Sequence, residues 1–452
     1  MKDKPRSAPR HDCNKLPDPT RRRLLQASGL GLAGLAAGGG LLQPEPARAV
    51  ATSARIVIVG GGAAGLSAAN RLAAGLSGAR ITIIEKRARH IYQPGLTLVA
   101  TGIWKQRKVL DRNERYVPSG ARWIKSMVAE FDPDANRVVT DAGEVVEYDY
   151  LIVTTGLKVD FSDIEGMSTD LIGQAGIGCV YDNNHHATRT WAMIDRFAQK
   201  GGVGLFTRPA GAIKCAGAPL KVTMLTEDLL QRRGRRRSAE FHYPTAEDSL
   251  FSQPDMNEFL KREFPDRGIN VRWTHRLAGI EPELQRATFA TPEGPVRLDY
   301  DFIHVVPAMR APDALADSAL AWQSGPFASG RWMEVDQHTL RHPRFPNVFG
   351  AGDCVGTPIG KTAASVKAQV PVATENMIRA IQQREMTARY NGYTSCPLIT
   401  ARGRGILVEF DYQLDMVPSF PFISPYEEHW VPWVMKDRML HAAYNAMMRG
   451  RV

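Results

Sequence analysis

Arg55-Ile56-Val57-Ile58-Val59-Gly60-Gly61-Gly62-Ala63-Ala64-Gly65 is the stretch that decides the fold of this 452-residue chain. It starts as an apolar strand, turns on glycine and continues into a helix of small residues to about Ala74, and a second strand, Arg80 to Ile84, ends in Glu85. Bare glycines let the backbone approach a pyrophosphate at the helix N-terminus, and an acid at this distance accepts from ribose hydroxyls. The unit therefore predicts a dinucleotide-binding α/β domain whose ligand contacts are Gly60, Gly62, Gly65 and Glu85.

Two later segments indicate that the nucleotide is FAD. Leu151 to Gly156 is a strand followed by a glycine turn, and Val348 to Asp353 is a strand that ends in an aspartate. Both resemble FAD contacts of the two-dinucleotide-binding, glutathione-reductase-like flavoproteins. The stretch that corresponds to their second glycine motif, Gly201 to Pro209, lacks the third glycine and runs on toward Cys215. We therefore expect no nicotinamide nucleotide site.

Composition and charge indicate a globular enzyme with a basic leader. Hydrophobic residues make up 44% of the chain and charged residues 23%, and the length allows two or three domains. Of the net charge of +10, residues 1 to 50 supply +5, from nine Lys and Arg against four Asp and Glu. The remaining +5 is too small to predict nucleic-acid binding.

The leader has the features of a twin-arginine export signal. Arg21-Arg22-Arg23 precedes an uncharged run from Ala27 to Gln43, and Ala47-Arg48-Ala49 follows. The run is shorter than about 18 residues and rich in glycine, which argues against a membrane anchor. We expect cleavage after Ala49 and a mature protein in the periplasm, peripheral on the inner membrane, where disulfides persist.

Four cysteines remain outside the leader: Cys179, Cys215, Cys354 and Cys396. They include no CxxC pair, so we expect neither a zinc site nor an iron–sulfur site. Three pairings are possible, and the sequence by itself does not choose among them.

The expected architecture is two Rossmann-like dinucleotide-binding domains and a C-terminal region. The bounds are 1–49 for the signal peptide, 50–160 and 325–385 for the FAD-binding domain, 161–324 for the second Rossmann-like domain, and 386–452 for a C-terminal membrane-contact region. Val431 to Met448 has apolar residues at helical spacing with basic residues nearby, which favours a helix in a membrane interface. Packing on the protein core or on a dimer partner is the alternative.

Four segments, in order, resemble the sulfide:quinone oxidoreductases, and most closely the subgroup with the mitochondrial enzymes. The resemblance runs from about Arg55 nearly to the C-terminus. The segments are Tyr92-Gln93-Pro94-Gly95-Leu96-Thr97-Leu98-Val99, Ile213-Lys214-Cys215-Ala216-Gly217-Ala218-Pro219, Gly352-Asp353-Cys354 with Lys361-Thr362-Ala363-Ala364, and Tyr393-Thr394-Ser395-Cys396-Pro397-Leu398.

The resemblance implies an enzyme that oxidises hydrogen sulfide through a Cys215–Cys354 disulfide and FAD and reduces membrane quinone. Sulfide would attack Cys354 to leave a persulfide, and the sulfane sulfur would pass to sulfide, a small thiol or sulfite. Cys179 and Cys396 receive no role. The remaining implied contacts are Gln93, Thr155, Gly156, Asp353 and Lys361 for FAD, and Tyr393, Phe410 and Tyr412 for quinone.

Three rival functions stay open at this point. A flavocytochrome c sulfide dehydrogenase subunit would pass electrons to a c-type cytochrome, and the export leader favours it. A non-catalytic flavoprotein that binds sulfane sulfur would keep its FAD oxidised in the presence of sulfide. A type II NADH dehydrogenase would share the FAD fold and quinone, but the incomplete second glycine motif argues against it. A homo-oligomer is compatible with all of them.

Overall fold

Strand β2 (Arg55–Val59) lies at the centre of the first sheet in the computed structural model of this protein. The structure describes residues 49–181 and 183–452, so the predicted export signal lies outside it except for Ala49. The four apolar residues of β2 are buried, as a parallel strand covered on both faces requires. All neighbours in this sheet are parallel, and their order is β22 (Val348–Gly350), β11 (Tyr150–Val153), β2, β4 (Arg80–Ile84) and β7 (Arg122–Ile124).

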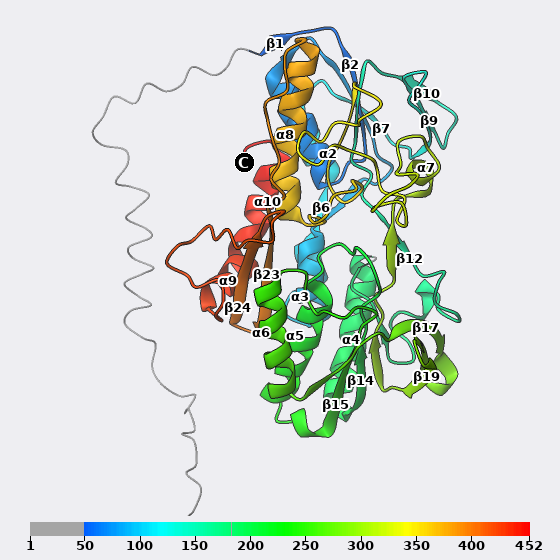
Figure 1. Cartoon of the computed structure of the whole chain (residues 1–452), viewed down its shortest axis with the longest axis vertical. Coiled ribbons are helices and arrows are strands. Elements are labelled where there is room, and N and C mark those ends of the chain that lie inside the picture. Colours follow the sequence, from blue (N-terminus) through cyan, green and yellow to red (C-terminus); the bar gives the residue numbers. More distant parts are fainter. Residues whose placement is uncertain (1–48, 182) are drawn as a thin grey trace, which may run out of the picture. The chain divides into compact units, whose positions relative to one another are not determined.

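Helices α2 (Ala63–Gly75) and α8 (Ala363–Ile381) pack against each other beside this sheet, and α10 (Leu440–Met448) packs on α2 (Figure 1). The small side chains of α2 permit this close packing. A separate three-stranded antiparallel sheet consists of β8 (Val128–Asp132), β9 (Arg137–Thr140) and β10 (Val145–Glu147).

A second five-stranded sheet is also entirely parallel. Its order is β13 (Ile177–Gly178), β20 (Phe302–His304), β14 (Gly202–Phe206), β15 (Ala239–Pro244) and β16 (Ile269–Arg272). Its helices are α4 (Asn184–Lys200), α5 (Ala218–Arg232) and α6 (Pro254–Asp266), and a meander of β17 (Arg276–Glu281), β18 (Arg286–Thr291) and β19 (Gly294–Asp299) lies beside it. Two parallel sheets confirm the predicted α/β class with Rossmann-like domains.

Shorter elements complete the described chain. Antiparallel strands β12 (Lys158–Asp160) and β21 (Ala308–Arg310) run between the two sheets in Figure 1. Strand β1 (Val50–Ala51) pairs with β3 (Leu76–Ser77), and β5 (Arg89–Ile91) pairs with β6 (Leu110–Arg112). The short helices are η1 (Gln93–Gly95), α3 (Leu96–Ala100), η2 (Gln106–Val109), η3 (Asn113–Arg115), η4 (Thr169–Leu171), η5 (Arg236–Ser238), η6 (Pro282–Leu284) and α7 (Asp313–Ala316).

The C-terminal part consists of an antiparallel hairpin and an interrupted helix. The hairpin is β23 (Thr394–Ala401) and β24 (Arg404–Phe410). Helix α9 (Trp430–Val434) leads through a π-helical turn, η7 (Met435–Met439), into α10. Residues 49–452 form one compact unit, so the predicted domain bounds remain a prediction.

The apolar side of α10 does not face outward. Tyr444, Met447 and Met448 are buried, and Asn70 of α2 donates its Nδ2–H to the Met448 carbonyl at 2.9 Å. The membrane-interface interpretation of Val431 to Met448 is therefore corrected for α10, because α2 covers the side that the helical spacing makes apolar. Among residues 49–181 and 183–452, no helix is both long and apolar enough to cross a membrane.

Candidate redox site

Three glycine turns meet at the carboxyl ends of β2, β11 and β22. A Cβ on Gly60 would lie 2.4 Å from the Thr154 carbonyl oxygen, and a Cβ on Gly65 would lie 1.8 Å from that of Gly60. A Cβ on Gly352 would meet that of Ala64 at 3.2 Å, which places the third turn against the start of α2. The structure thus brings together the three segments in which FAD contacts were predicted.

The space above the first turn is open on the side where a pyrophosphate would lie. A Cβ on Gly62 would meet no atom within 4 Å, and no side chain caps the N-terminus of α2. Glu85 accepts from the Gly61 N–H at 2.9 Å and pairs with Arg87. Although burial opposes it, Arg87 keeps the pKa of Glu85 below its usual value, so the carboxylate is charged. A dinucleotide fits this cradle.

The other predicted cofactor contacts lie around the same turns. Thr155 and Gly156 follow β11, and Gln93 is exposed in η1. Burial raises the pKa of Asp353. Lys361 is buried, donates to the carbonyls of Asp353 and Val355 at 2.8 and 2.9 Å, and lies over the Trp332 ring. Burial lowers the pKa of Lys361 to about 8.

In the second sheet, a cysteine loop takes the place of a phosphate-binding turn. The glycines at 202 and 204 lie inside β14 rather than after it, so the predicted absence of a glycine turn has a direct structural reason. The chain leaving β14 passes through Arg208 and reaches Cys215 just before the N-terminus of α5. That helix end, which faces a phosphate in a nucleotide-binding unit, here favours the negative charge of a thiolate.

The backbone of Cys215 is held in a conformation that non-glycine residues rarely adopt, with φ +48°. Its N–H donates to the Lys361 carbonyl at 2.9 Å, and its own carbonyl accepts from Ala218 N–H at 2.7 Å and Tyr181 Oη at 3.3 Å. A rare backbone conformation that several hydrogen bonds hold in place is typical of a functional position. The bond to Lys361 also ties the cysteine loop to the segment that follows the third FAD turn.

Cys215 lies beside Cys396 and not beside Cys354. The Lys221 Nζ of α5 donates to Cys215 Sγ at 3.2 Å and to Cys396 Sγ of β23 at 3.4 Å. A thiol–thiolate hydrogen bond joins the two sulfurs. The contacts of Lys221 thus place Cys396, which has no role assigned from the sequence, in the same cluster as Cys215, and the redox pairing of Cys215 stays a proposal.

Cys354 lies in a different environment, between β11 and the turn that follows β22. Its side chain is fully buried, and its Sγ contacts the backbone carbonyls of Val153 and Ala351 at 3.4 and 3.5 Å. Burial raises the pKa of Cys354 to about 11, so the sulfur is a protonated thiol at neutral pH. The contact with the Val153 carbonyl shows that this side chain points back toward β11, and a redox role for Cys354 stays a prediction.

The two paired cysteines differ in charge. The hydrogen bond from Cys396, supported by the Lys221 and Lys436 charges, holds the pKa of Cys215 well below its usual range despite burial. The same hydrogen bond and burial raise the pKa of Cys396. Cys215 is thus the thiolate of the pair and Cys396 the thiol.

Lys221 and Lys436 are the functional residues that sequence reasoning missed. Both are buried, with 1% and 3% exposure. Lys436 extends from the π-helical turn to the Pro94 carbonyl, and burial lowers its pKa to about 8. The available signal was a lysine inside the apolar stretch Pro219-Leu220-Lys221-Val222, since buried lysines are rare without a partner.

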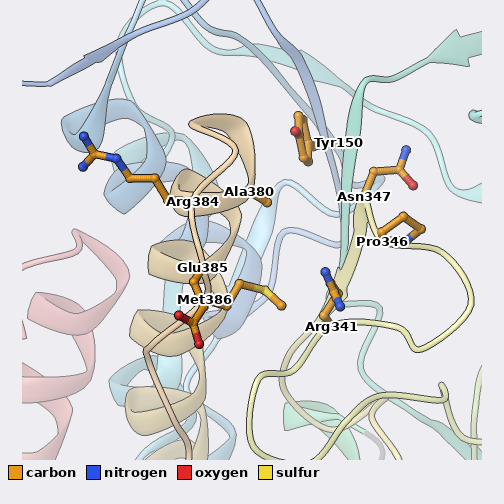
Figure 2. A pocket seen from close by; sticks show the side chains of 8 residues that line it. All are labelled: Tyr150, Arg341, Pro346, Asn347, Ala380, Arg384, Glu385 and Met386. Atoms are coloured by element: carbon orange, nitrogen blue, oxygen red, sulfur yellow. The ribbon is translucent and has the colours of Figure 1, made fainter.

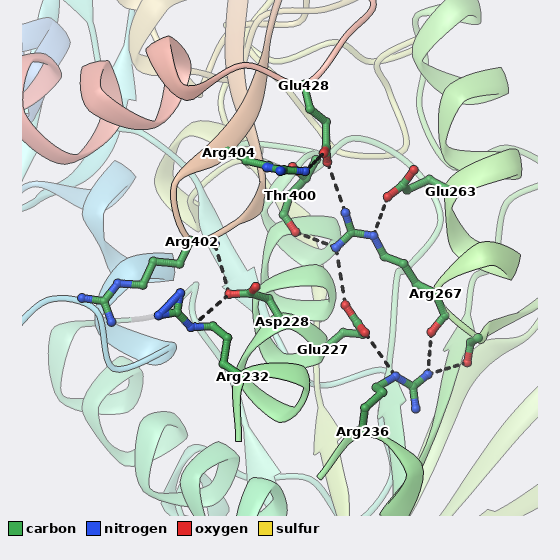
Figure 3. A network of polar contacts seen from close by, with 11 residues as sticks. Glu227, Asp228, Arg232, Arg236, Glu263, Arg267, Thr400, Arg402, Arg404 and Glu428 are labelled. Carbon is green, nitrogen blue, oxygen red and sulfur yellow. Dashed lines mark hydrogen bonds and ion pairs between the residues drawn. The ribbon is translucent and has the colours of Figure 1, made fainter. Parts of the chain in front are cut away.

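A network of ion pairs fixes the strand of Cys396 against the helix of Lys221 (Figure 3). Arg267, at the end of α6, contacts Glu227 of α5 at 3.5 Å, the Thr400 carbonyl of β23 at 2.8 Å and Glu428 at 3.2 Å. Arg236 pairs with Glu227 from the other side at 3.2 Å. The network joins four segments that are distant in the sequence.

The predicted quinone residues lie in the packing of the C-terminal hairpin. Phe410 is buried edge-on to Phe251, Tyr393 Oη donates to Glu409, and Tyr412 Oη donates to the Gln337 carbonyl. Their role in quinone binding stays a prediction.

A surface pocket of about 470 Å³ lies elsewhere (Figure 2). Its lining includes Tyr150 and Asn347, at the amino ends of β11 and β22, and Arg341. The redox cluster and the glycine turns lie at the opposite, carboxyl ends, so this pocket takes no part in the chemistry below.

Comparison with known proteins agrees with this geometry. Residues 54–202 match the family model described as pyridine nucleotide-disulphide oxidoreductase. The mitochondrial sulfide:quinone oxidoreductase of Mus musculus is 35% identical over 398 residues, covering 87% of this chain and 86% of that protein. The Dictyostelium discoideum mitochondrial protein of the same name is 36% identical, covering 88% and 86%.

The chain belongs to the sulfide:quinone oxidoreductase family. The solved structure of the Aquifex aeolicus sulfide:quinone oxidoreductase superposes with a TM-score of 0.73 at 19% identity, covering 88% of this chain and 92% of that one, which supports the fold. Proteins of this family are FAD-binding flavoproteins, and the open cradle at Gly62 fits that cofactor.

Proposed function

We propose that this sulfide:quinone oxidoreductase works through a redox disulfide between Cys215 and Cys396. The observation that carries the proposal is the placement of both sulfurs on one buried ammonium, Lys221 Nζ. A helix N-terminus and a lysine are what a reactive thiolate requires. Burial raises the pKa of Cys354 to about 11 despite the nearby charge of Lys361, and the proposal leaves Cys354 outside the reaction.

The sulfur chemistry balances on these residues. Hydrosulfide attacks Cys396 Sγ, forming a new S–S bond, and the Cys215–Cys396 bond breaks with its electron pair leaving on Cys215. The outer persulfide sulfur then passes to a second sulfide, a small thiol or sulfite, and Cys396 is left as a thiol. When thiolate and thiol close the disulfide again, two electrons and one proton are released.

FAD, when bound at the three glycine turns, would supply the acceptor for these electrons and their route to quinone. The chain's own residues bind it through the turns at Gly60 to Gly65, Thr155 and Gly156, and Asp353, with Gln93 and Lys361 near by. Tyr393, Phe410 and Tyr412 remain the proposed quinone contacts, although each has a packing or hydrogen-bonding role in the hairpin.

We further propose a periplasmic enzyme, exported by its twin-arginine leader and peripheral on the membrane. The Arg21-Arg22-Arg23 segment supports export. The membrane contact is supported by exposed apolar side chains of the C-terminal part at Phe422, Tyr426 and Met439.

The test is an anaerobic titration with sulfide in which the flavin absorbance is measured. The proteins compared are wild type, Cys215→Ser, Cys396→Ser and Cys354→Ser. Wild type and Cys354→Ser should bleach, and the other two should stay oxidised. Bleaching of Cys396→Ser but not of Cys354→Ser would restore the pairing predicted from the sequence, and an unresponsive wild type would refute the function. Adding a soluble quinone or cytochrome c then identifies the acceptor by which one restores the colour.

A further inference from the structure

Lys221 is a buried cation that depends on the two cysteines for its partners. The hydrogen bonds recorded for its Nζ within residues 49–181 and 183–452 go to Cys215 Sγ and Cys396 Sγ. Burial opposes the charge, but the thiolate form of Cys215 and the Cys396 sulfur raise the pKa of Lys221 above its usual value. An ammonium with 1% exposure is tolerable only while such a counter-charge is present.

Lys436 adds a second positive charge to the same cluster. It lies in the π-helical turn, and its Nζ donates to the neutral Pro94 carbonyl. Burial and the Lys221 charge lower the pKa of Lys436, whereas Cys215 and Cys396 raise it, so its charge is within electrostatic range of the cluster. Tyr92 and Tyr181 also face Cys215 and are neutral phenols.

The redox state of the cysteines therefore sets the net charge of the cluster. With the cysteines open, as in this structure, one thiolate offsets one of the two ammonium groups. Closing the disulfide removes that thiolate, because neither sulfur of a disulfide carries a charge. Lys221 is then a buried cation that has lost its anionic partner.

We propose that the oxidised site binds one small monovalent anion at Lys221, and that hydrosulfide is recruited in this way. This inference rests on the proposed function and names the ionisation state of the substrate and the residues that select it. The reduced site does not bind a small anion, because the Cys215 thiolate already pairs with the Lys221 ammonium.

The reaction keeps this charge in place. Incoming hydrosulfide brings one negative charge to Lys221, and attack on Cys396 transfers that charge to the departing Cys215 sulfur. Both positions are within hydrogen-bond reach of the same Nζ, since Lys221 already contacts both sulfurs. The Lys221 ammonium is thus paired with an anion before and after the step. The partner is hydrosulfide before the attack and the Cys215 thiolate after it.

The first experiment needs no variant and uses thiocyanate, a monovalent anion that supplies no electrons under these conditions, as the probe. Thiocyanate should compete with sulfide in the reduction of the flavin of the wild-type holoenzyme. In calorimetric titrations under argon it should bind the oxidised enzyme and not the photochemically reduced enzyme. Equal binding in both redox states, or inhibition that sulfide does not relieve, would overturn the proposal.

The second experiment compares Lys221→Met, Lys221→Arg and, as a matched control for loss of one lysine charge, Lys367→Met on the exposed side of α8. At low sulfide, Lys221→Met should lower the second-order rate constant of flavin reduction roughly 10- to 100-fold, the size of a lost charge-assisted hydrogen bond. Thiocyanate should no longer compete. Lys221→Arg should restore both properties in part, and the control should match wild type.

Failure of the inference and failure of the proposed function give different results. If wild-type flavin does not respond to sulfide, the function is wrong. If it responds, and Lys221→Met shows the wild-type dependence on sulfide and thiocyanate, only the anion site is wrong. Should Lys221→Met not fold, the thiocyanate titrations of wild type in its two redox states still decide.

Discussion

At the residue scale, Gly62 and Gly65 respond in opposite ways to one added methyl group. A Cβ at Gly62 meets no protein atom within 4 Å, whereas one at Gly65 would overlap the Gly60 carbonyl oxygen. We expect Gly62→Ala to fold normally but to purify with little FAD, because its methyl group fills the pyrophosphate space. Gly65→Ala should lose both cofactor and stability. Flavin absorbance per protein and thermal unfolding of each variant check this, and full FAD content in Gly62→Ala would contradict it.

His304 gives the described structure a specific sensitivity to acid. It is fully buried at the end of β20, and neither ring nitrogen has a hydrogen-bond partner. Burial lowers the pKa of His304 to about 3, so the unfolded chain binds a proton below pH ~6.5 while the folded chain does not. His304 therefore does not change the free energy of unfolding above pH ~6.5. Below that pH the protein loses stability until the pH reaches about 3.

The expected cost is about 1.4 kcal/mol for each pH unit below the unfolded value. Between pH ~6.5 and 5, wild type should lose about 2 kcal/mol more unfolding free energy than His304→Leu, which cannot take up this proton. Urea unfolding at the two pH values measures the difference. Parallel loss in both proteins would show that His304 does not titrate in this way.

At the element scale, local elements followed from the sequence, but the cysteine pairing did not. The first strand–turn–helix unit and its two companion segments lie where their glycines and apolar runs predicted them. Cys354 lies four residues after the end of β22, and its closeness to the flavin segment in the sequence suggested a redox role that stays a prediction. Cys396 meets Cys215 only because hairpin β23–β24 packs against α5, a contact between segments about 180 residues apart. No local pattern encodes such a contact.

The position of that hairpin depends on Arg267. Arg267 is 14% exposed, and Glu227 beside it is only 4% exposed, so removing the guanidinium leaves a buried carboxylate with Arg236 alone. We expect Arg267→Met to lower the free energy of unfolding by about 3 kcal/mol and to increase proteolysis within 401–429.

Arg404→Met is the matched control for this prediction. Its guanidinium also pairs with Glu428, but at 3.8 Å and with 70% exposure. An exposed pair of this kind contributes about 0–1 kcal/mol. Equal destabilisation of the two variants in chemical unfolding would mean that the network does not hold the hairpin.

At the scale of the whole molecule, the C-terminal part carries both proposed redox residues and the proposed membrane contact. This part supplies Cys396 on β23 and Lys436 in the π-helical turn. It also carries exposed apolar side chains on the segment between the hairpin and α9, where Phe422 is 77% and Tyr426 51% exposed. A quinone dissolved in a bilayer must reach the enzyme from the surface that touches the lipid, so a contact close to the redox elements is the expected arrangement.

We therefore predict that Phe422 and Tyr426 bind the enzyme to lipid. The double change Phe422→Ser and Tyr426→Ser should weaken partition onto vesicles at least tenfold, since burying one aromatic side chain contributes about 1.5–3 kcal/mol. Turnover with a short, water-soluble quinone should be unchanged, because neither residue contacts the cysteine cluster. Leu284→Ser is the matched control, as Leu284 is 57% exposed on the distant β17–β18 turn. If the control and the double variant lose vesicle binding equally, or if neither does, the membrane surface lies elsewhere on the molecule.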